Sequence, residues 1–282
     1  MKIKDIIMKY ENKLKKISDT PRLDIELILQ KVLFVDKLYI MLNLEKEITD
    51  LELENFIDLI NQRLDNRPVA YITEHREFMG LDFFVKEGVL IPRCDTETLV
   101  EEIIKIYENN HKKEIKILDI GTGSGAISVS LAKYLKNSKV TSFDIEETPL
   151  EVGKLNAKTN NVDVEFLKSD LFEVIKDSGR KFDIIVSNPP YIPYADMDSL
   201  HCQVKDYEPH SALFANNNGL FFYEEITKQS GDYLNEGGIL AYEVGYNQSE
   251  CVVSIMEKYN FNKIYKIKDI QGIDRVVIGY KL

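Results

Sequence analysis

From about residue 93 onward, short apolar runs alternate with segments whose apolar residues recur at helical spacing. Such runs are typical of strands buried in a sheet, and their alternation with helices predicts a doubly wound, mostly parallel sheet. The last two runs are separated only by a short Asp-Ile-Gln-Gly loop, so we expect these strands to pair antiparallel. The seven predicted strands are Ile115–Leu118, Val140–Phe143, Val164–Leu167, Phe182–Ser187, Ile239–Val244, Phe261–Lys268 and Asp274–Tyr280.

The first 65 or so residues have a helical period throughout. Apolar residues recur every three or four positions in three stretches, at residues 3–14, 23–32 and 51–60. Thr20-Pro21 predicts a helix start, and Thr49-Asp50 predicts a helix cap. Because the segment carries no glycine-rich loop and no cluster of catalytic residue types, two interpretations stay open: a domain that docks the substrate, or an appendage that stabilises the protein.

A linker is predicted between the helical segment and the sheet. Arg67-Pro68 breaks the helical pattern, and Glu77–Val85 has the pattern of a short hairpin with Gly80 near its turn. We therefore divide the chain into a helical domain, a linker with a β-hairpin and an α/β domain. Their predicted boundaries are 1–65, 66–92 and 93–282.

Composition and charge narrow the function classes. The 282-residue chain is 44% hydrophobic, enough for a large α/β domain and a small one, and no apolar run approaches the ~18 residues of a membrane span. The formal net charge of −11 argues against wide, sequence-independent contact with nucleic acid. Three cysteines without disulfide or metal-ligand spacing, and a charged amphipathic start unlike a signal peptide, favour the cytoplasm and predict no metal.

A glycine-rich turn follows the first predicted strand of the α/β domain. It comprises Gly121, Thr122, Gly123, Ser124 and Gly125. This G-x-G-x-G pattern differs from the dinucleotide fingerprint and from the P-loop, but its glycines let the backbone approach a ligand closely. About twenty residues on, the next strand ends at Asp144, where an acidic residue usually holds a ribose hydroxyl pair. Together they predict a nucleoside ligand; the alternative is a tight turn beside an exposed aspartate.

The turn Asn188-Pro189-Pro190-Tyr191 after the fourth predicted strand is the most informative motif. Each proline holds the preceding residue extended, and neither has an N–H group, so the turn offers mainly hydrogen-bond acceptors. The side-chain oxygen of Asn188 and the carbonyl of Pro189 can converge on one NH2 group, while the ring of Tyr191 covers a planar group. This suits an amide or amino nitrogen that acts as a nucleophile. The alternative is a proline-rich turn with a packed tyrosine.

These motifs, with Ser169-Asp170-Leu171-Phe172, resemble those of class I S-adenosylmethionine (SAM) methyltransferases that methylate amino groups. The chain as a whole resembles the release-factor glutamine methyltransferases (the PrmC/HemK family) nearly from end to end. Adenine N6-methyltransferases share Asn-Pro-Pro-Tyr, so this motif specifies the chemistry and leaves the substrate open. Cys94 and Glu74 depart from the family pattern, which usually has proline and glycine there. The stretches that favour the glutamine enzymes include Arg67–Ile72, Glu77–Leu81, Val89–Arg93, Asp95–Glu97, Tyr207–Pro209, Ala212–Phe214, Glu243–Gly245 and Asp274–Arg275.

The resemblance implies a SAM-dependent enzyme that methylates N5 of the glutamine in the Gly-Gly-Gln motif of class I peptide chain release factors and produces S-adenosyl-L-homocysteine. It implies a Rossmann-like doubly wound sheet with an antiparallel edge strand, preceded by a small all-helical domain and the hairpin linker. We expect a cytoplasmic monomer with no direct nucleic-acid or membrane partner. Two rival functions stay open: an N6-adenine methyltransferase acting on nucleic acid, and a SAM-fold binding protein without catalysis.

The resemblance also assigns site residues. The cofactor-binding residues it implies are Gly121, Thr122, Gly123, Ser124, Gly125, Asp144, Asp170, Leu171 and Asn188. The catalytic and substrate-binding residues it implies are Asn188, Pro189, Pro190 and Tyr191. Arg93, Thr96 and Glu97 resemble a loop that closes over the cofactor, although Thr96 and Glu97 also suit a first-turn helix cap.

Overall fold

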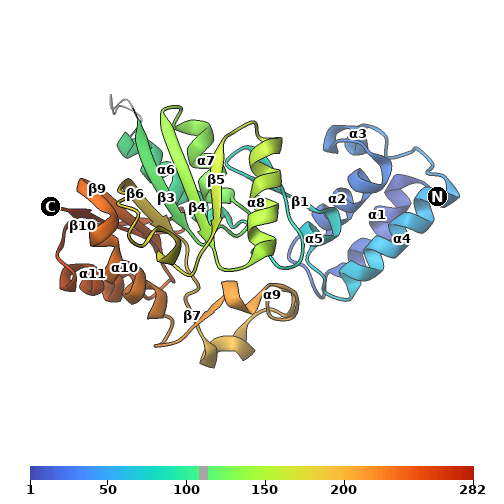
Figure 1. Cartoon of the computed structure of the whole chain (residues 1–282). Helices are drawn as coiled ribbons and strands as arrows, with labels where there is room; N and C mark the ends of the chain where they lie inside the picture. The colour runs from blue at the N-terminus through green and yellow to red at the C-terminus, as the bar shows by residue number, and fades with distance from the viewer. Residues whose placement is uncertain (108–113) are drawn as a thin grey trace. The chain divides into compact units, whose positions relative to one another are not determined.

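A computed structural model describes residues 1–107 and 114–282 of the chain (Figure 1). The chain forms two compact units. The first contains Met1–His75 and His201–Tyr207, and the second contains Arg76–Leu200 and Glu208–Leu282. A short segment inside the second stretch of chain thus belongs to the first unit. Within the described residues, no helix is both long and apolar enough to cross a membrane.

The first unit is built of helices around one apolar core. Its helices are α1 (Ile3–Leu14), α2 (Pro21–Leu33), α3 (Lys37–Leu42), α4 (Asp50–Leu64), α5 (Val69–Thr73) and α9 (Cys202–Tyr207). As predicted, α2 begins at Pro21, where a missing N–H group costs nothing, and Thr49 caps α4. Thr49 and Glu52 form a reciprocal capping box. The core includes Ile3, Ile6, Tyr10, Leu14, Ile25, Ile28, Leu29, Phe56 and Ile60.

Helix α5 lies within residues 66–92, which the sequence assigned to a linker. Pro68 breaks the pattern of α4 but immediately precedes a new helix, and Ile72 of α5 packs into the core of the first unit. The first unit therefore extends past residue 65 to His75. Proline is common both just after a helix ends and where a new helix begins. Pro68 alone therefore could not show whether a linker or a short helix follows it.

The departure at Glu74 lies at the end of α5. Glu74 has the left-handed φ of 58° that ends this helix, a conformation that suits the glycine expected there and costs another residue roughly 1 kcal/mol. Its carboxylate pairs with Lys31 Nζ at 2.6 Å, which ties the strained residue to α2.

The predicted hairpin is present as β1 (His75–Phe78) and β2 (Leu81–Phe84). Its turn residues, Met79 and Gly80, have positive φ of 53° and 66°, as in a two-residue type I′ turn.

The second unit contains a seven-stranded sheet (Figure 1). Its strands are β3 (Ile115–Ile120), β4 (Ser138–Asp144), β5 (Val164–Lys168), β6 (Phe182–Ser187), β9 (Leu234–Glu243), β10 (Phe261–Lys268) and β11 (Asp274–Lys281). Their order is β10-β11-β9-β6-β3-β4-β5. All seven predicted strands are confirmed, and the largest boundary error is at β9, which begins at Leu234 where Ile239 was expected.

The reversed strand is not at the edge of the sheet, so this detail of the predicted topology is wrong. β11 pairs antiparallel with both β10 and β9, which makes it second from the edge and leaves β10 outside it. The reason is burial: β11 has a fully buried centre at Val276–Gly279, whereas β10 alternates with exposed positions and therefore suits the edge.

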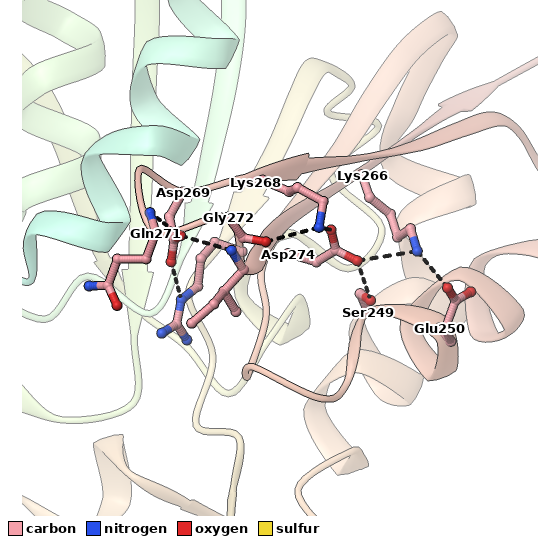
Figure 2. Close-up of polar contacts among 10 residues, drawn as sticks. Ser249, Glu250, Lys266, Lys268, Asp269, Gln271, Gly272 and Asp274 are labelled. Atoms are coloured by element: carbon pink, nitrogen blue, oxygen red, sulfur yellow. Dashed lines mark hydrogen bonds and ion pairs between the residues drawn. The ribbon is translucent and has the colours of Figure 1, made fainter.

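The hairpin turn between β10 and β11 is held by Asp269, whose Oδ1 accepts the N–H groups of Gln271 at 2.8 Å and Ile273 at 3.0 Å (Figure 2). Beside it, Asp274 pairs with Lys266 at 3.2 Å and Lys268 at 3.5 Å.

Helices cover both faces of the sheet. One face packs on α6 (Cys94–Tyr107), α7 (Ala126–Tyr134) and α8 (Glu147–Thr159), and the other packs on α10 (Phe221–Tyr233) and α11 (Ser249–Lys258). Neighbouring strand residues divide between the two cores, since Ile117 lies on the first face and Leu118 on the second. Because helices cover both faces of the sheet, a ligand site is expected beyond the carboxyl ends of the strands.

We predict that Asp24→Ala unfolds the first unit locally. Arg63 Nε lies 2.7 Å from Asp24 Oδ2, and both side chains are at most 4% exposed. Removing the carboxylate would leave a buried guanidinium unpaired, at a cost of about 3–5 kcal/mol. Hydrogen exchange should show lost protection in α1, α2 and α4 and little change in the sheet. Glu45→Ala, which removes an exposed partner of Lys2 and Lys4, is the control and should leave that protection intact. Equal protection in both variants would contradict the prediction.

Candidate active site

The ends of four strands bring three predicted site residues, together with Glu243, into one row. The parallel registers pair Ile120 with both Phe143 and Ser187, and Ser187 with Tyr242. The next residue of each strand is therefore, in spatial order, Glu243, Asn188, Gly121 and Asp144. Residues at the same register level extend from the same face of a sheet, here the face that α6, α7 and α8 cover.

The glycine-rich turn needs glycine at three positions. Gly121, Gly123 and Gly125 have φ of 92°, 53° and 79°, a region that side chains disfavour. A Cβ added at Gly123 would meet no heavy atom within 4 Å, whereas one at Gly125 would lie 3.1 Å from the Cα of Gly153 in α8. The turn is thus open toward a ligand at Gly123 and closely packed at Gly125.

Asp144 holds the glycine-rich turn with its carboxylate. Its Oδ2 accepts the N–H group of Gly123 at 3.1 Å, and its Oδ1 accepts that of Glu146 at 3.0 Å. Burial raises the pKa of Asp144, and the two backbone donors oppose that shift. The carboxylate is therefore fixed beside the turn. Its predicted role is to bind the hydroxyl groups of a ribose.

A buried polar layer lies beneath the turn. Ser142 Oγ donates to Asp119 Oδ2 at 3.1 Å and lies 2.8 Å from Thr122 Oγ1. Burial raises the pKa of Asp119 to about 7. Thr122 and Ser124 are both buried. Asp119 was not among the predicted site residues; its place two residues before Gly121 was the available signal.

Asp170 and Leu171 follow the end of β5. Asp170 is exposed, and Leu171 is half-buried in a left-handed conformation with φ of 47°. Ser169 holds this backbone, since its Oγ donates to the Leu171 carbonyl at 2.9 Å and accepts the N–H group of Val174 at 3.1 Å. The Ser169 N–H group donates to the Asp144 carbonyl at 2.9 Å, so this loop is tied to the end of β4.

The turn Asn188–Tyr191 lies against the glycine-rich turn. A Cβ added at Gly121 would lie 4.0 Å from the Asn188 carbonyl oxygen, and Ser187 Oγ donates to the Ile120 carbonyl at 2.6 Å. Pro189 is buried and Pro190 half-buried. Two short strands, β7 (Ile192–Pro193) and β8 (Phe214–Ala215), pair directly after the turn and fix its exit.

Tyr191 is held by residues from the end of β9 and the loop after it. Its hydroxyl donates to Glu243 Oε1 at 3.3 Å, and its carbonyl accepts from Gln248 Nε2 at 2.9 Å. A Cβ at Gly219 would lie 2.0 Å from the same carbonyl oxygen, so only glycine fits there. Burial raises the pKa of Tyr191, which keeps its hydroxyl protonated as a donor. Of the residues that hold Tyr191, Glu243 was among those that carried the family resemblance.

Thr96 contacts the acceptor turn from α6. Its Oγ1 accepts from Asn188 Nδ2 at 3.3 Å and donates to Glu243 Oε2. The two other residues that resemble a loop over the cofactor engage other protein groups. Arg93 pairs with the buried carboxylate of Glu208 at 2.5 Å, and Glu97 accepts the N–H group of Met79 at 2.7 Å.

A separate cavity of about 540 Å³ lies at the other end of the sheet, where the parallel strands begin. The residues that line it include Lys116, Lys139 and Asp183, near the amino ends of β3, β4 and β6, and Arg180, which precedes β6. Open α/β sheets bind ligands at the carboxyl ends, so this cavity is not the candidate active site.

The chemistry of the row fits SAM. The turn offers backbone at Gly121 and Gly123, Asp144 offers a carboxylate for hydroxyl groups, and Leu171 offers apolar contact beside them. Asn188 adds an amide at the neighbouring strand end. Within residues 1–107 and 114–282, His, Cys, Asp and Glu side chains form no group of three that could hold a metal ion.

The comparisons with known proteins agree on both units. The family described as the PrmC N-terminal domain matches residues 5–73, and the methyltransferase small domain matches residues 95–201. The release factor glutamine methyltransferase of Clostridium acetobutylicum is 43% identical over 284 residues, which cover 100% of this chain and 99% of that protein.

Solved structures share the fold. A methyltransferase from Pyrococcus furiosus gives a TM-score of 0.53 at 22% identity, over 79% of this chain and 98% of that chain. A T. thermophilus 16S rRNA methyltransferase in complex with AdoMet and guanosine also gives 0.53, at 16% identity, over 74% of this chain and 50% of that chain. The mixed seven-stranded sheet is therefore that of the class I SAM-dependent methyltransferases. With its identity to a curated relative over nearly the full length of both proteins, the chain belongs to the release factor glutamine methyltransferase family.

Proposed function

We propose that the protein transfers the methyl group of SAM to the side-chain nitrogen (N5) of the glutamine in the Gly-Gly-Gln motif of class I peptide chain release factors. The relative from C. acetobutylicum is named for methylation of a release factor glutamine. The observation that carries the proposal is the orientation of Asn188. Its amide nitrogen donates to Thr96 Oγ1, which leaves its oxygen, Oδ1, to accept from a substrate NH2 group.

An amide nitrogen is a poor nucleophile because its lone pair is delocalised into the carbonyl. SAM supplies an activated methyl group on a sulfonium that leaves as a neutral thioether. Asn188 Oδ1 and the Pro189 carbonyl would hold the two N–H bonds and withdraw positive charge from them. These acceptors gain strength as the nitrogen becomes more positive, so they stabilise the transition state more than the bound substrate.

The proposed SAM site comprises residues of the row and the loop after β5. We assign SAM binding to the backbone of residues 121–125, the carboxylate of Asp144, the loop residues Asp170 and Leu171, and Asn188. Support comes from the open backbone at Gly123 and the fixed carboxylate of Asp144. The product would be S-adenosyl-L-homocysteine. That the reaction needs no metal stays a prediction, which activity in the presence of a chelator tests.

We propose that the first unit docks the release factor. Several large apolar side chains of this unit are exposed, including Phe34 at 94% and Leu42 at 75%. Phe34 also ends α2 in a left-handed conformation with φ of 54°. Binding energy from such remote contacts would help to hold the acceptor glutamine in the active site. A monomer without direct nucleic-acid contact is part of the same proposal.

One experiment separates this function from its rivals. The protein is incubated with methyl-labelled SAM and either a class I release factor or DNA, and the labelled residue is identified by mass spectrometry. We expect label on the Gly-Gly-Gln glutamine. Label on adenine of DNA alone would support the rival N6-adenine activity, and no label on either would contradict the proposal.

Asn188→Ala should abolish methyl transfer with the fold intact. The change removes one of two acceptors that act on the substrate nitrogen, so SAM affinity should fall only modestly. Turnover above about a tenth of wild type, a loss of less than ~1.4 kcal/mol, would contradict the two-acceptor arrangement. Asn262→Ala, in β10 at the sheet edge, is the matched control and should keep full turnover.

Asp144→Ala should raise the dissociation constant for SAM about tenfold or more, as expected for the loss of charge-assisted hydrogen bonds to a ribose. Isothermal titration calorimetry measures this directly. Asp163→Ala, an exposed acid in the same unit, controls for the change in net charge. Equal affinities in the two variants would place Asp144 outside the cofactor site.

Substituting both Phe34 and Leu42 by alanine should lower kcat/KM for an intact release factor about tenfold, the effect of ~1.4 kcal/mol of lost contact. Turnover of a short Gly-Gly-Gln peptide should not change, because such a peptide lacks the other surfaces of the release factor that the first unit would bind. Leu155→Ala, which truncates an exposed leucine of α8 in the second unit, is the control. If the double variant methylates intact release factor normally, these side chains have no docking role.

A further inference from the structure

Three side chains, of which Thr96 and Glu243 are buried and Asn188 is half-buried, form a hydrogen-bonded network behind the acceptor turn. Asn188 Nδ2 donates to Thr96 Oγ1 at 3.3 Å, and Thr96 Oγ1 donates in turn to Glu243 Oε2. Thr96 is 5% exposed and Glu243 2% exposed, so water has little access to the bond between them. These hydrogen bonds connect Thr96 of α6 with Glu243 at the end of β9 and with Asn188, which follows β6.

The direction of this network follows from counting hydrogens. An ionised carboxylate only accepts hydrogen bonds, and a hydroxyl has a single hydrogen to donate. Because Thr96 gives that hydrogen to Glu243, its oxygen can only accept from Asn188. The NH2 end of the Asn188 amide must therefore face Thr96, and Oδ1 is left at the opposite end of the planar amide.

The other oxygen of the same carboxylate holds Tyr191. Glu243 Oε1 accepts from the Tyr191 hydroxyl at 3.3 Å, so one side chain contacts both ends of the acceptor turn, directly at Tyr191 and through Thr96 at Asn188. Burial raises the pKa of Glu243. The donors Thr96 and Tyr191 and the positive charge of Arg275 act against that shift and favour the ionised form.

We propose that Glu243 and Thr96 are positioning residues that fix the amide of Asn188 with its oxygen toward the acceptor nitrogen. This inference rests on the proposed function, because it assigns Asn188 Oδ1 to the substrate. Neither residue touches the substrate in this arrangement. Without them the amide could rotate by half a turn and present its NH2 group to the NH2 group of the glutamine. Two donors would then face each other, and the turn would lose one of its two acceptors.

A purely structural role predicts a different result. If the network only satisfies buried polar groups, its loss lowers stability and affects all ligands alike. If it orients Asn188, its loss lowers kcat while the KM for release factor and the affinity for SAM change little, because the oriented oxygen matters most in the transition state.

Thr96→Val tests the relay, because valine has nearly the shape of threonine and no hydroxyl. We expect kcat to fall at least about tenfold, with KM and the SAM dissociation constant within about threefold of wild type. Thr96→Ser keeps the hydroxyl and should restore kcat to within about threefold of wild type. Thr98→Val makes the same change two positions along α6, outside the network, and should leave kcat unchanged.

Glu243→Gln tests the direction of the relay with little change in shape. Glutamine can present either its oxygen or its NH2 group to Thr96, and in the second case the Thr96 hydrogen is free to turn toward Asn188 Oδ1. We expect a loss of kcat of at least about fivefold, again with SAM affinity nearly unchanged.

Nitrogen-15 NMR of the Asn188 side chain gives a readout besides activity. In the wild-type protein its NH2 protons should exchange slowly with water because one is donated to buried Thr96. The same resonance should exchange faster in Thr96→Val. Thermal denaturation of each variant confirms that the protein is folded at the assay temperature.

The inference is overturned if Thr96→Val keeps kcat within about twofold of wild type while Asn188→Ala is inactive, since Asn188 would then work without the relay. It is also overturned if Thr96→Ser loses as much kcat as Thr96→Val does. Failure of the proposed function has another signature: Asn188→Ala itself would keep its turnover on release factor, or wild-type protein would not label the glutamine.

Discussion

The parallel register of β4, β3, β6 and β9 is the constraint on which the rest of the site depends. Strands that run in one direction and pair without a shift end at the same level, so the first residue beyond each one meets its neighbours. Gly121, Asp144, Asn188 and Glu243 come from four segments far apart in sequence, yet each comes directly after the last position at which these four strands pair with one another. A slip of one residue in any pair would turn its side chain to the opposite face of the sheet.

Helix α6 completes this arrangement because it covers the face from which the row extends. The helix buries Leu99, Val100 and Ile103 against the sheet and carries Thr96 one turn earlier, at the level of the strand ends. The same packing that builds the core therefore delivers a hydroxyl to Asn188 and Glu243. A buried polar network of this kind is rigid only if every member has a partner. The short reach of threonine also requires α6 to lie close to the sheet.

Much of this could be predicted from the sequence, since the strand pattern, the glycine turn and Asn188–Tyr191 are local signals with strong physical causes. The helical core and the capping box at Thr49 were likewise visible as period and cap chemistry. The place of β11 inside the sheet was not, because pairing order depends on which strand is more apolar once both are present. The link from Glu243 to Asn188 through Thr96 could not be predicted either. A carboxylate after a strand looks like any other until the register is known.

The segment His201–Tyr207 gives the chain an unusual connectivity. It belongs to the helical unit, where the Tyr207 hydroxyl donates to the Asp65 carbonyl at 2.8 Å, although the residues before and after it belong to the sheet unit. The backbone therefore passes between the units three times, and two of these passages flank a segment that begins ten residues after Tyr191. Residues 1–75 consequently lack one piece of their own fold. In evolution, the helical unit could not be exchanged between methyltransferases as one contiguous segment. A complete exchange would need three crossovers, and two of them would lie downstream of the acceptor turn.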